Sequence, residues 1–196
     1  MPSQALLKTF PDYPAFISVD VETAGTYPRD YAMLSIGACT IPEPRQTFYI
    51  ELKPDKPNMS EGSAAVHGLS MEELKQNGIE STEALQRFEG WLGEVVPGEA
   101  TPIFVALNAP FDWMFVNDYF MHYLGRNPFG HKALDMKAFF MGLHHVPWGE
   151  TGFREMGEHY LKERVLVHNA LQDAIDQAEM FQEMLEEAAK NPKPTR

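Results

Sequence analysis

The order of the apolar segments is the feature that most constrains how this chain can fold. Three short runs rich in β-branched and other apolar residues come first, and they predict strands at residues 15–21, 33–41 and 47–52. Pro42 and Pro44 place a turn between the second and third runs, which favours an antiparallel meander. The first part of the chain is therefore expected to be rich in strands.

The rest of the chain alternates between strand-length and helical patterns. Apolar runs at 102–107 and 133–135 predict strands, and helical spacing or composition predicts helices at 81–96, 111–124 and 136–143. Strands followed by alternating strands and helices are typical of a layered α/β domain. We therefore expect a mixed central β-sheet flanked by α-helices.

The last helix has the clearest pattern. Its apolar stripe repeats at intervals of three and four residues and consists of Leu171, Ala174, Ile175, Ala178, Phe181 and Leu185. Asn169 fits the N-cap of this helix and Gln172 fits its N3 partner. Asn191 and Pro192 are expected to stop it.

Length and composition indicate one soluble domain. With 44% apolar residues, the chain can bury a single core over residues 1–196, with short flexible ends at about 1–14 and 190–196. The single cysteine, Cys39, excludes an internal disulfide, and its apolar surroundings predict a buried, inert thiol. No apolar run approaches the length of a membrane span, so we expect a cytoplasmic protein without a membrane partner.

The charge balance limits how the chain can meet a nucleic acid. Its 16 basic and 28 acidic residues give a formal net charge of −12, which argues against a general duplex coat held by charge alone. A nucleic-acid partner must be met at a small local site, where cations can supply positive charge. The phosphate loops of nucleotide-driven motors, the glycine-rich turn of dinucleotide oxidoreductases and the nucleophile elbow of serine hydrolases do not occur in the sequence.

Two acidic residues at the end of the first predicted strand are the first candidates for chemistry. Asp20 and Glu22 are two residues apart, so on a strand their side chains project from the same face. Carboxylates placed in this way repel, and each raises the pKa of the other unless a cation lies between them. On its own, the pair is better explained as two solvated side chains at a strand end.

Two further segments place acidic residues beside apolar elements. In one, a strand runs into the turn that begins at Asn108 and delivers Asp112 to the first turn of a helix, where an aspartate also favours the helix dipole. In the other, His168 lies just outside the last helix and can reach over a site that Asp173 faces from the second turn. Each of these residues alone also has a structural explanation.

The four carboxylates and the histidine together indicate metal-dependent hydrolysis. Oxygen ligands without a cysteine cluster suit hard cations, Mg²⁺ or Mn²⁺, rather than structural zinc. Two such ions about 3.5–4 Å apart can hold the attacking and leaving oxygens of a phosphate displacement. A histidine can take the proton of the attacking water, because its ordinary pKa lies near neutrality.

The same segments resemble the motifs of a known nuclease superfamily. Asp20-Val21-Glu22-Thr23, Asn108-Ala109-Pro110-Phe111-Asp112 and His168-Asn169-Ala170-Leu171-Gln172-Asp173 are similar, in this order, to the three exonuclease motifs of the DEDDh branch. This branch includes ribonuclease T, oligoribonuclease and the proofreading subunit of bacterial replicative DNA polymerase. The resemblance implies a ribonuclease H-like fold and 3′–5′ exonuclease activity that releases nucleoside 5′-monophosphates.

The resemblance also implies a role for each matching residue. Asp20, Glu22 and Asp173 would hold the metal ion that activates water. Asp20 would bridge to a second ion, to which Asp112 would bind directly or through water. His168 would be the general base, and the cofactors would be two divalent ions, Mg²⁺ or Mn²⁺.

Substrate contacts are implied at five further positions. Thr23 would lie near the terminal nucleotide, and Asn108 is a second candidate from the motifs. His67, in a His-Gly segment, would touch the 3′ end or the region of the scissile phosphate. Phe111 and Phe129 are candidates for stacking on terminal bases, and core packing is the alternative for each of them.

The implied partners are 3′ ends of single-stranded DNA or RNA. Members of the ribonuclease T type form dimers, so the resemblance also implies a possible homodimer. Two other functions stay open: a non-catalytic exonuclease-like interaction module and a phosphodiesterase of very short oligonucleotides.

The pair His144-His145 is interpreted as part of a solvent-exposed loop. Adjacent residues do not share a face, and no third metal ligand is near them in sequence.

Overall fold

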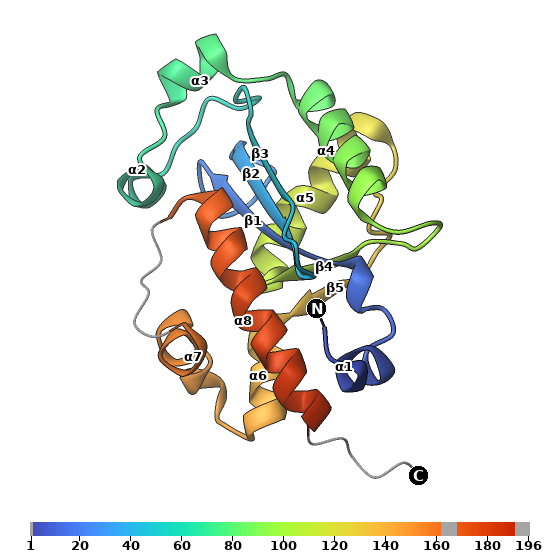
Figure 1. Ribbon diagram of the computed structural model, residues 1–196. Helices are drawn as coiled ribbons and strands as arrows, with labels where there is room; N and C mark the ends of the chain where they lie inside the picture. The colour runs from blue at the N-terminus through green and yellow to red at the C-terminus, as the bar shows by residue number, and fades with distance from the viewer. Residues whose placement is uncertain (1, 162–167, 191–196) are drawn as a thin grey trace.

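A five-stranded sheet forms the centre of the molecule (Figure 1). The computed structural model describes residues 2–161 and 168–190. The strands are β1 (Phe16–Thr23), β2 (Met33–Thr40), β3 (Thr47–Glu51), β4 (Ile103–Ala106) and β5 (Ala133–Asp135). Their order is β3-β2-β1-β4-β5, with β1 to β3 antiparallel and with β4 and β5 parallel to β1. The predicted mixed sheet is therefore confirmed.

Helices cover both faces of the sheet. In chain order they are α1 (Gln4–Thr9), α2 (Glu61–His67), α3 (Met71–Asn77), α4 (Ser81–Val95), α5 (Ala109–Leu124), α6 (Met136–His144), α7 (Phe153–Tyr160) and α8 (Ala170–Lys190), with 3₁₀ turns η1 (Tyr13–Ala15) and η2 (Trp148–Glu150). α8 crosses one face beside α1, α6 and α7, and α4 and α5 cover the other (Figure 1). No helix within the described ranges is both long and apolar enough to cross a bilayer.

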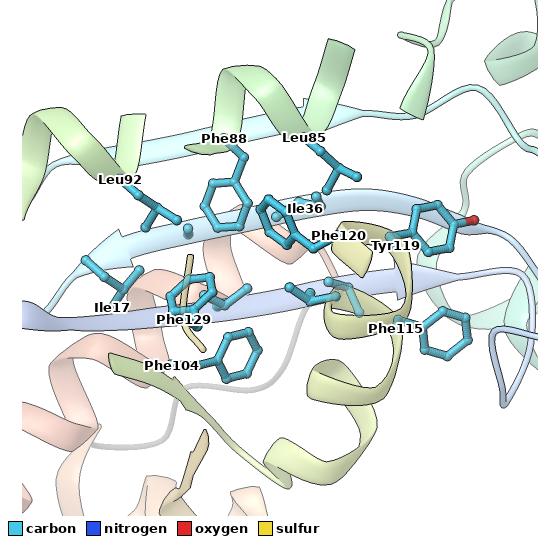
Figure 2. Close-up of a cluster of buried hydrophobic side chains, with 14 of the residues drawn as sticks. Ile17, Ile36, Leu85, Phe88, Leu92, Phe104, Phe115, Tyr119, Phe120 and Phe129 are labelled. Atoms are coloured by element: carbon cyan, nitrogen blue, oxygen red, sulfur yellow. The ribbon is translucent and has the colours of Figure 1, made fainter. Parts of the chain in front are cut away.

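Alternation along β1 divides its side chains between two apolar clusters. Ile17 and Val19 are buried on the side of α4 and α5, in the cluster drawn in Figure 2. Phe16 faces the other way and packs in the cluster that includes α8. Because residues two apart share a face, Asp20 and Glu22 also lie on the α8 side, near the C-terminal end of β1.

The apolar patterns predict the five strands and the longer helices well and miss the short helices. Every strand and helix predicted above is present, with ends that shift by one or two residues. β1 extends to Thr23, so both of its carboxylates lie on the strand itself. The helices α1, α2, α3 and α7 have only six to eight residues, which is too short for a helical repeat to show in the sequence.

The expectation of a flexible N-terminal end is wrong for most of that segment. Leu6 of α1 is fully buried in the cluster around α8, and Tyr13 is 1% exposed. Ser3 caps α1 by accepting a 3.1 Å hydrogen bond from the Leu6 amide. Their packing partners include residues of α8 near the other end of the chain, so no local pattern could show this burial. Residues 191–196, at the other expected flexible end, lie outside the described part of the chain.

Candidate active site

Three carboxylates from two elements converge beside the central strand. One oxygen atom from each of Asp20, Glu22 and Asp173 lies within 4.8 Å of the other two. β1 supplies the first two from one face, and the N-terminal part of α8 supplies the third. The predicted meeting of the first and third motifs is therefore present in the fold.

A glycine on β2 allows α8 to approach closely enough for this meeting. Gly37 pairs with Asp20 across the β1–β2 ladder. A Cβ atom at this glycine would lie 2.1 Å from the backbone carbon and oxygen of Ala170, the first residue of α8. The absent side chain therefore lets the start of the helix rest on the sheet directly beside the carboxylates.

The cap of α8 orients one of the three carboxylates. Asn169 Oδ1 accepts a 3.1 Å hydrogen bond from the Gln172 amide, which confirms the predicted N-cap. The group that reaches back to the Asn169 amide is Asp173 Oδ2, at 3.2 Å, rather than the side chain of Gln172. The capping interaction therefore holds Asp173 in place at the acidic cluster.

Asp112 lies beside this cluster on the first turn of α5. Its Oδ1 accepts a 3.1 Å hydrogen bond from the Val21 amide, and the residue is 4% exposed. The turn before it places Asn108 in the left-handed region, with φ 61°. Asp135 Oδ2 accepts a 2.7 Å hydrogen bond from the Ala109 amide, so this aspartate fixes the start of α5. Nothing in the sequence pattern pointed to that function of Asp135.

The burial of the acidic groups favours their protonated forms when no cation is present. Burial and the charges of Asp112, Glu22 and Asp173 raise the pKa of Asp20 well above its usual range. Burial, followed by the charge of Asp173, raises the pKa of Glu22 to about 7. Burial raises the pKa of Asp112 to about 8. Repulsion from neighbouring carboxylates adds to the effect of burial on Asp20 and Glu22, and a divalent cation would relieve it.

A cleft of about 380 Å³ contains all five predicted catalytic residues. Its lining includes the four carboxylates, His168, Thr23, His67, Asn108, Phe111, Leu107 and Gln177. His168 is exposed and has φ 50°, so it lies outside the helical backbone as expected. His67 Nδ1 accepts a 3.0 Å hydrogen bond from the Leu69 amide, which leaves the ring proton on Nε2 in the neutral form.

The structure corrects the expectation for Phe129. This residue is 3% exposed and packs against the rings of Phe88 and Phe104 in the core (Figure 2). Its ring is therefore enclosed by core side chains and cannot stack on a base in the cleft. Phe111, by contrast, does line the cleft. The sequence could not separate the two, because an aromatic residue suits either environment.

Helix α2 forms a wall of the cleft that sequence patterns missed. Ser60, Ser63 and Val66 line the same cleft as the acidic cluster. Ser60 caps the helix through a 3.2 Å hydrogen bond from the Ser63 amide, and Gly68, with φ 68°, ends it. The capping serine and the glycine after a short segment were the available signals.

The fold and this cleft define a nuclease of the DEDDh class, with four acidic residues and a histidine around one site. A family model described as an exonuclease matches residues 17–181, so the chain belongs to this exonuclease family. Over 170 residues it is 44% identical to the "3′-5′ DNA exonuclease Cap18" of Escherichia coli, which covers 87% of this chain and 91% of that protein.

Solved structures show the same architecture. The nuclease domain of 3′hExo, described as a DEDDh family member bound to rAMP, superposes with a TM-score of 0.73 at 16% identity, over 89% of this chain and 93% of that one. E. coli Exonuclease I in complex with a dT13 oligonucleotide gives a TM-score of 0.70 at 15% identity, over 90% of this chain and 42% of that one. The predicted ribonuclease H-like fold and the enzyme class are confirmed, which favours an enzyme over a non-catalytic module.

Proposed function

We propose that this chain removes nucleoside 5′-monophosphates from the 3′ end of single-stranded DNA in a reaction that depends on divalent metal ions. The observation that carries the proposal is the convergence of Asp20, Glu22 and Asp173 within 4.8 Å in a cleft that also contains a histidine. DNA is proposed ahead of RNA because the relative that is 44% identical is named a DNA exonuclease.

The donor set of the cleft fits hard divalent cations. Each of the four candidate ligands offers carboxylate oxygen, and burial has raised the pKa of three of them in the absence of a cation. Asp20, Glu22 and Asp173 would hold one ion. Asp20 would hold a second together with Asp112, which lines the same cleft. Mg²⁺ or Mn²⁺ matches this oxygen-only set, and bound there it would polarise the scissile phosphate and neutralise developing charge.

The chain's own residues supply the other steps of the hydrolysis. An imidazole nitrogen of His168 takes a proton from the attacking water. This side chain lines the cleft, and its residue precedes the first turn of α8. The water oxygen bonds to phosphorus as the bond to the 3′ oxygen of the penultimate nucleotide breaks, and that oxygen takes a proton from solvent. Thr23, Asn108, His67 and Phe111 lie around this position and would hold the terminal nucleotide.

The volume of the cleft and the net charge of the protein favour contact with only a few nucleotides of the substrate. The cleft holds about 380 Å³, and the net charge of −12 offers no extended positive track for a long strand. Low processivity on single-stranded ends is therefore expected. The same small volume favours one second candidate, a phosphodiesterase of very short oligonucleotides.

Degradation of 5′-labelled oligomers tests the proposal. Single-stranded DNA, RNA of the same sequence and a dinucleotide would each be incubated with Mg²⁺ or Mn²⁺ and, separately, with a chelator. A ladder that shortens from the 3′ end of DNA, and that requires the metal, is the expected result. Faster cleavage of the dinucleotide would favour the second candidate, and faster cleavage of RNA would contradict the choice of DNA.

A matched pair of variants ties this activity to the cleft. Asp20→Asn should reduce turnover by about 10³-fold or more, since several kcal/mol of charge stabilisation is lost with the metal ligand. Asp118→Asn, an exposed position on α5, should keep wild-type turnover. Full activity of a folded Asp20→Asn protein would overturn the assignment of the site.

Two further expectations belong to this proposal. A homodimer is supported by the resemblance to ribonuclease T, and the mass in solution from light scattering would check it. A cytoplasmic location is supported by the one buried, unpaired cysteine, because a free thiol suits a reducing compartment. Cell fractionation would check it.

A further inference from the structure

A second cluster of metal-ligating side chains lies where three helices meet. His144 ends α6, His159 lies near the end of α7, and Glu187 lies near the end of α8. One ligand atom from each lies within 4.8 Å of the other two. The Nε2 atoms of both histidines are 3.8 Å from Glu187 Oε2.

This cluster is separate from the catalytic cleft. Glu187 follows Asp173 by 14 residues on the same helix, which corresponds to about 21 Å along its axis. α6 and α7 lie beside the half of α8 that is remote from its N-terminal end (Figure 1). An ion bound here would therefore not share ligands with the acidic cluster.

We propose that His144, His159 and Glu187 bind a Zn²⁺-class transition-metal ion. Two imidazoles and one carboxylate form a mixed nitrogen and oxygen donor set, which suits zinc and its neighbours better than magnesium. Three protein ligands would leave the fourth tetrahedral position to water. The ion would connect α6, α7 and α8, which no covalent crosslink joins, as the chain has one cysteine.

The distances in the cluster are close to those that zinc requires. Ligands at about 2.0–2.1 Å from a tetrahedral ion lie about 3.3 Å from one another. The two nitrogen–oxygen pairs at 3.8 Å therefore need to close by about half an ångström. The side chain of His159 is 51% exposed and can make this movement without disturbing the core, whereas that of His144 is 16% exposed and is already held.

The surroundings support the two partly buried ligands, His144 and Glu187. The Tyr160 hydroxyl donates a 3.0 Å hydrogen bond to Glu187 Oε2, and it lies 2.7 Å from His144 Nε2. The ring of Phe140 packs 4.4 Å from that of His144 and forms an apolar wall. The hydroxyl donates its one proton to Glu187, so its contact with His144 is accepted from an Nε2–H. With an ion bound, this ring proton would move to Nδ1, Nε2 would direct its lone pair to the metal, and Tyr160 would keep the carboxylate oriented.

This cluster corrects the interpretation of the adjacent histidines. His144 is the last helical residue of α6 and is partly buried, so it does not belong to an exposed loop. The expected loop position holds for His145, which is exposed and has φ 57°. The further ligands that are absent nearby in sequence are supplied in space by α7 and α8.

Zinc titration of a protein with a disabled catalytic cluster tests the proposal. The double variant Asp20→Asn, Asp173→Asn removes two carboxylates of the acidic site and serves as the background. Isothermal titration of this metal-free protein with ZnCl₂ should show one bound ion, and the midpoint of thermal unfolding should rise with zinc, because the unfolded chain does not hold the three ligands together. MgCl₂ should produce neither effect.

Single substitutions in that background identify the ligands. His159→Ala and Glu187→Gln should each weaken zinc binding by at least about tenfold and remove most of the thermal shift. His145→Ala is the matched control and should behave as the background does. Tyr160→Phe should still bind zinc, because the hydroxyl is not a ligand. Zinc binding that is absent from the background, or that is unchanged by His159→Ala and Glu187→Gln, would overturn the proposal.

Discussion

The side chain of Gln177 connects the carboxylate of Asp20 to the end of the neighbouring strand. Its Nε2 donates a 2.8 Å hydrogen bond to Asp20 Oδ1, and its Oε1 accepts a 2.8 Å hydrogen bond from the Leu107 amide. Gln177 is 1% exposed, so both bonds are shielded from water. One residue of α8 therefore fixes the orientation of a candidate metal ligand on β1 relative to β4.

Removing this amide should impair catalysis more than folding. Gln177→Ala frees the Asp20 carboxylate to rotate, and we expect turnover to fall by about 10–100-fold and the metal concentration for half-maximal activity to rise. Gln177→Glu should be worse, because it replaces the donor with a fifth carboxylate in the cleft. Steady-state kinetics across a Mn²⁺ titration measures both effects.

The control for this prediction lies on the same helix. Gln182 contacts Arg45 and Glu186, away from the cleft, so Gln182→Ala should leave turnover and metal dependence unchanged. A Gln177→Ala protein with wild-type metal dependence would show that the hydrogen bond to Asp20 does not matter for metal binding.

Substitution of His168 should separate proton transfer from substrate binding. His168→Ala should lower kcat by about 10²–10⁴-fold and change KM little, because the histidine acts on water rather than on the nucleotide. His67→Ala, a change at the end of α2 in the same cleft, should mainly raise KM. Kinetics of both variants on one DNA oligomer make the comparison. A loss confined to KM in His168→Ala would argue against a general base at this position.

The stability of the metal-free protein should fall as the pH rises. Glu22 and Asp112 have folded-state pKa values of about 7 and about 8, whereas their ordinary values are 4.5 and 3.8. Between these limits the unfolded chain releases protons that the folded chain keeps. Stability is therefore full below the ordinary pKa values, falls progressively as the pH rises, and reaches its lower level once the pH has passed 7 to 8. Thermal unfolding from pH 5 to 9 in a chelator should show this decrease.

The same experiment has an internal check. Asp112→Asn keeps an oxygen to accept the Val21 amide and removes the charge, so it should flatten the profile and raise the midpoint at pH 8. Mn²⁺ should also raise the midpoint at pH 8, because a cation relieves the repulsion among the carboxylates. A midpoint that is constant or increases between pH 5 and 8 in the chelator would contradict the assigned pKa shifts.

Two phenylalanines should respond in opposite ways to truncation. Phe111→Ala should weaken binding of a single-stranded oligomer by about 1–3 kcal/mol, since the ring lines the cleft. Phe129→Ala should instead cost about 3–5 kcal/mol of unfolding free energy, because its ring fills the core. Oligomer titration and chemical denaturation of each variant distinguish the two. Normal stability of Phe129→Ala would contradict its placement in the core.

Local patterns in the sequence were sufficient to predict the strands, the longer helices and the acidic residues of the candidate site. Buried strands and amphipathic helices carry periodic apolar residues, so β1 and α8 could be located to within two residues. Asp20 and Glu22 could be placed on one face because strand geometry depends only on neighbouring residues. The cap at Asn169 was predictable for the same reason, since its partners lie within one turn.

Contacts between distant segments were decided only by the tertiary structure. Gln177 meets Asp20 across 157 positions of the chain, and no local pattern marks that glutamine as part of the site. Gly37 matters because a helix that begins 133 residues later (170 − 37) rests on it. Neither relationship exists until α8 has packed on the sheet.

The two histidine sites show the same division. His168 could be recognised from its spacing to Asp173, because both belong to one short segment. His144 could not, since its neighbours in the cluster, His159 and Glu187, come from two other helices. The sequence by itself determined the strands, the helices and the acidic residues at their ends, through interactions among near neighbours. The packing of α6, α7 and α8 decided which distant side chains meet, because that depends on how the buried surfaces fit together.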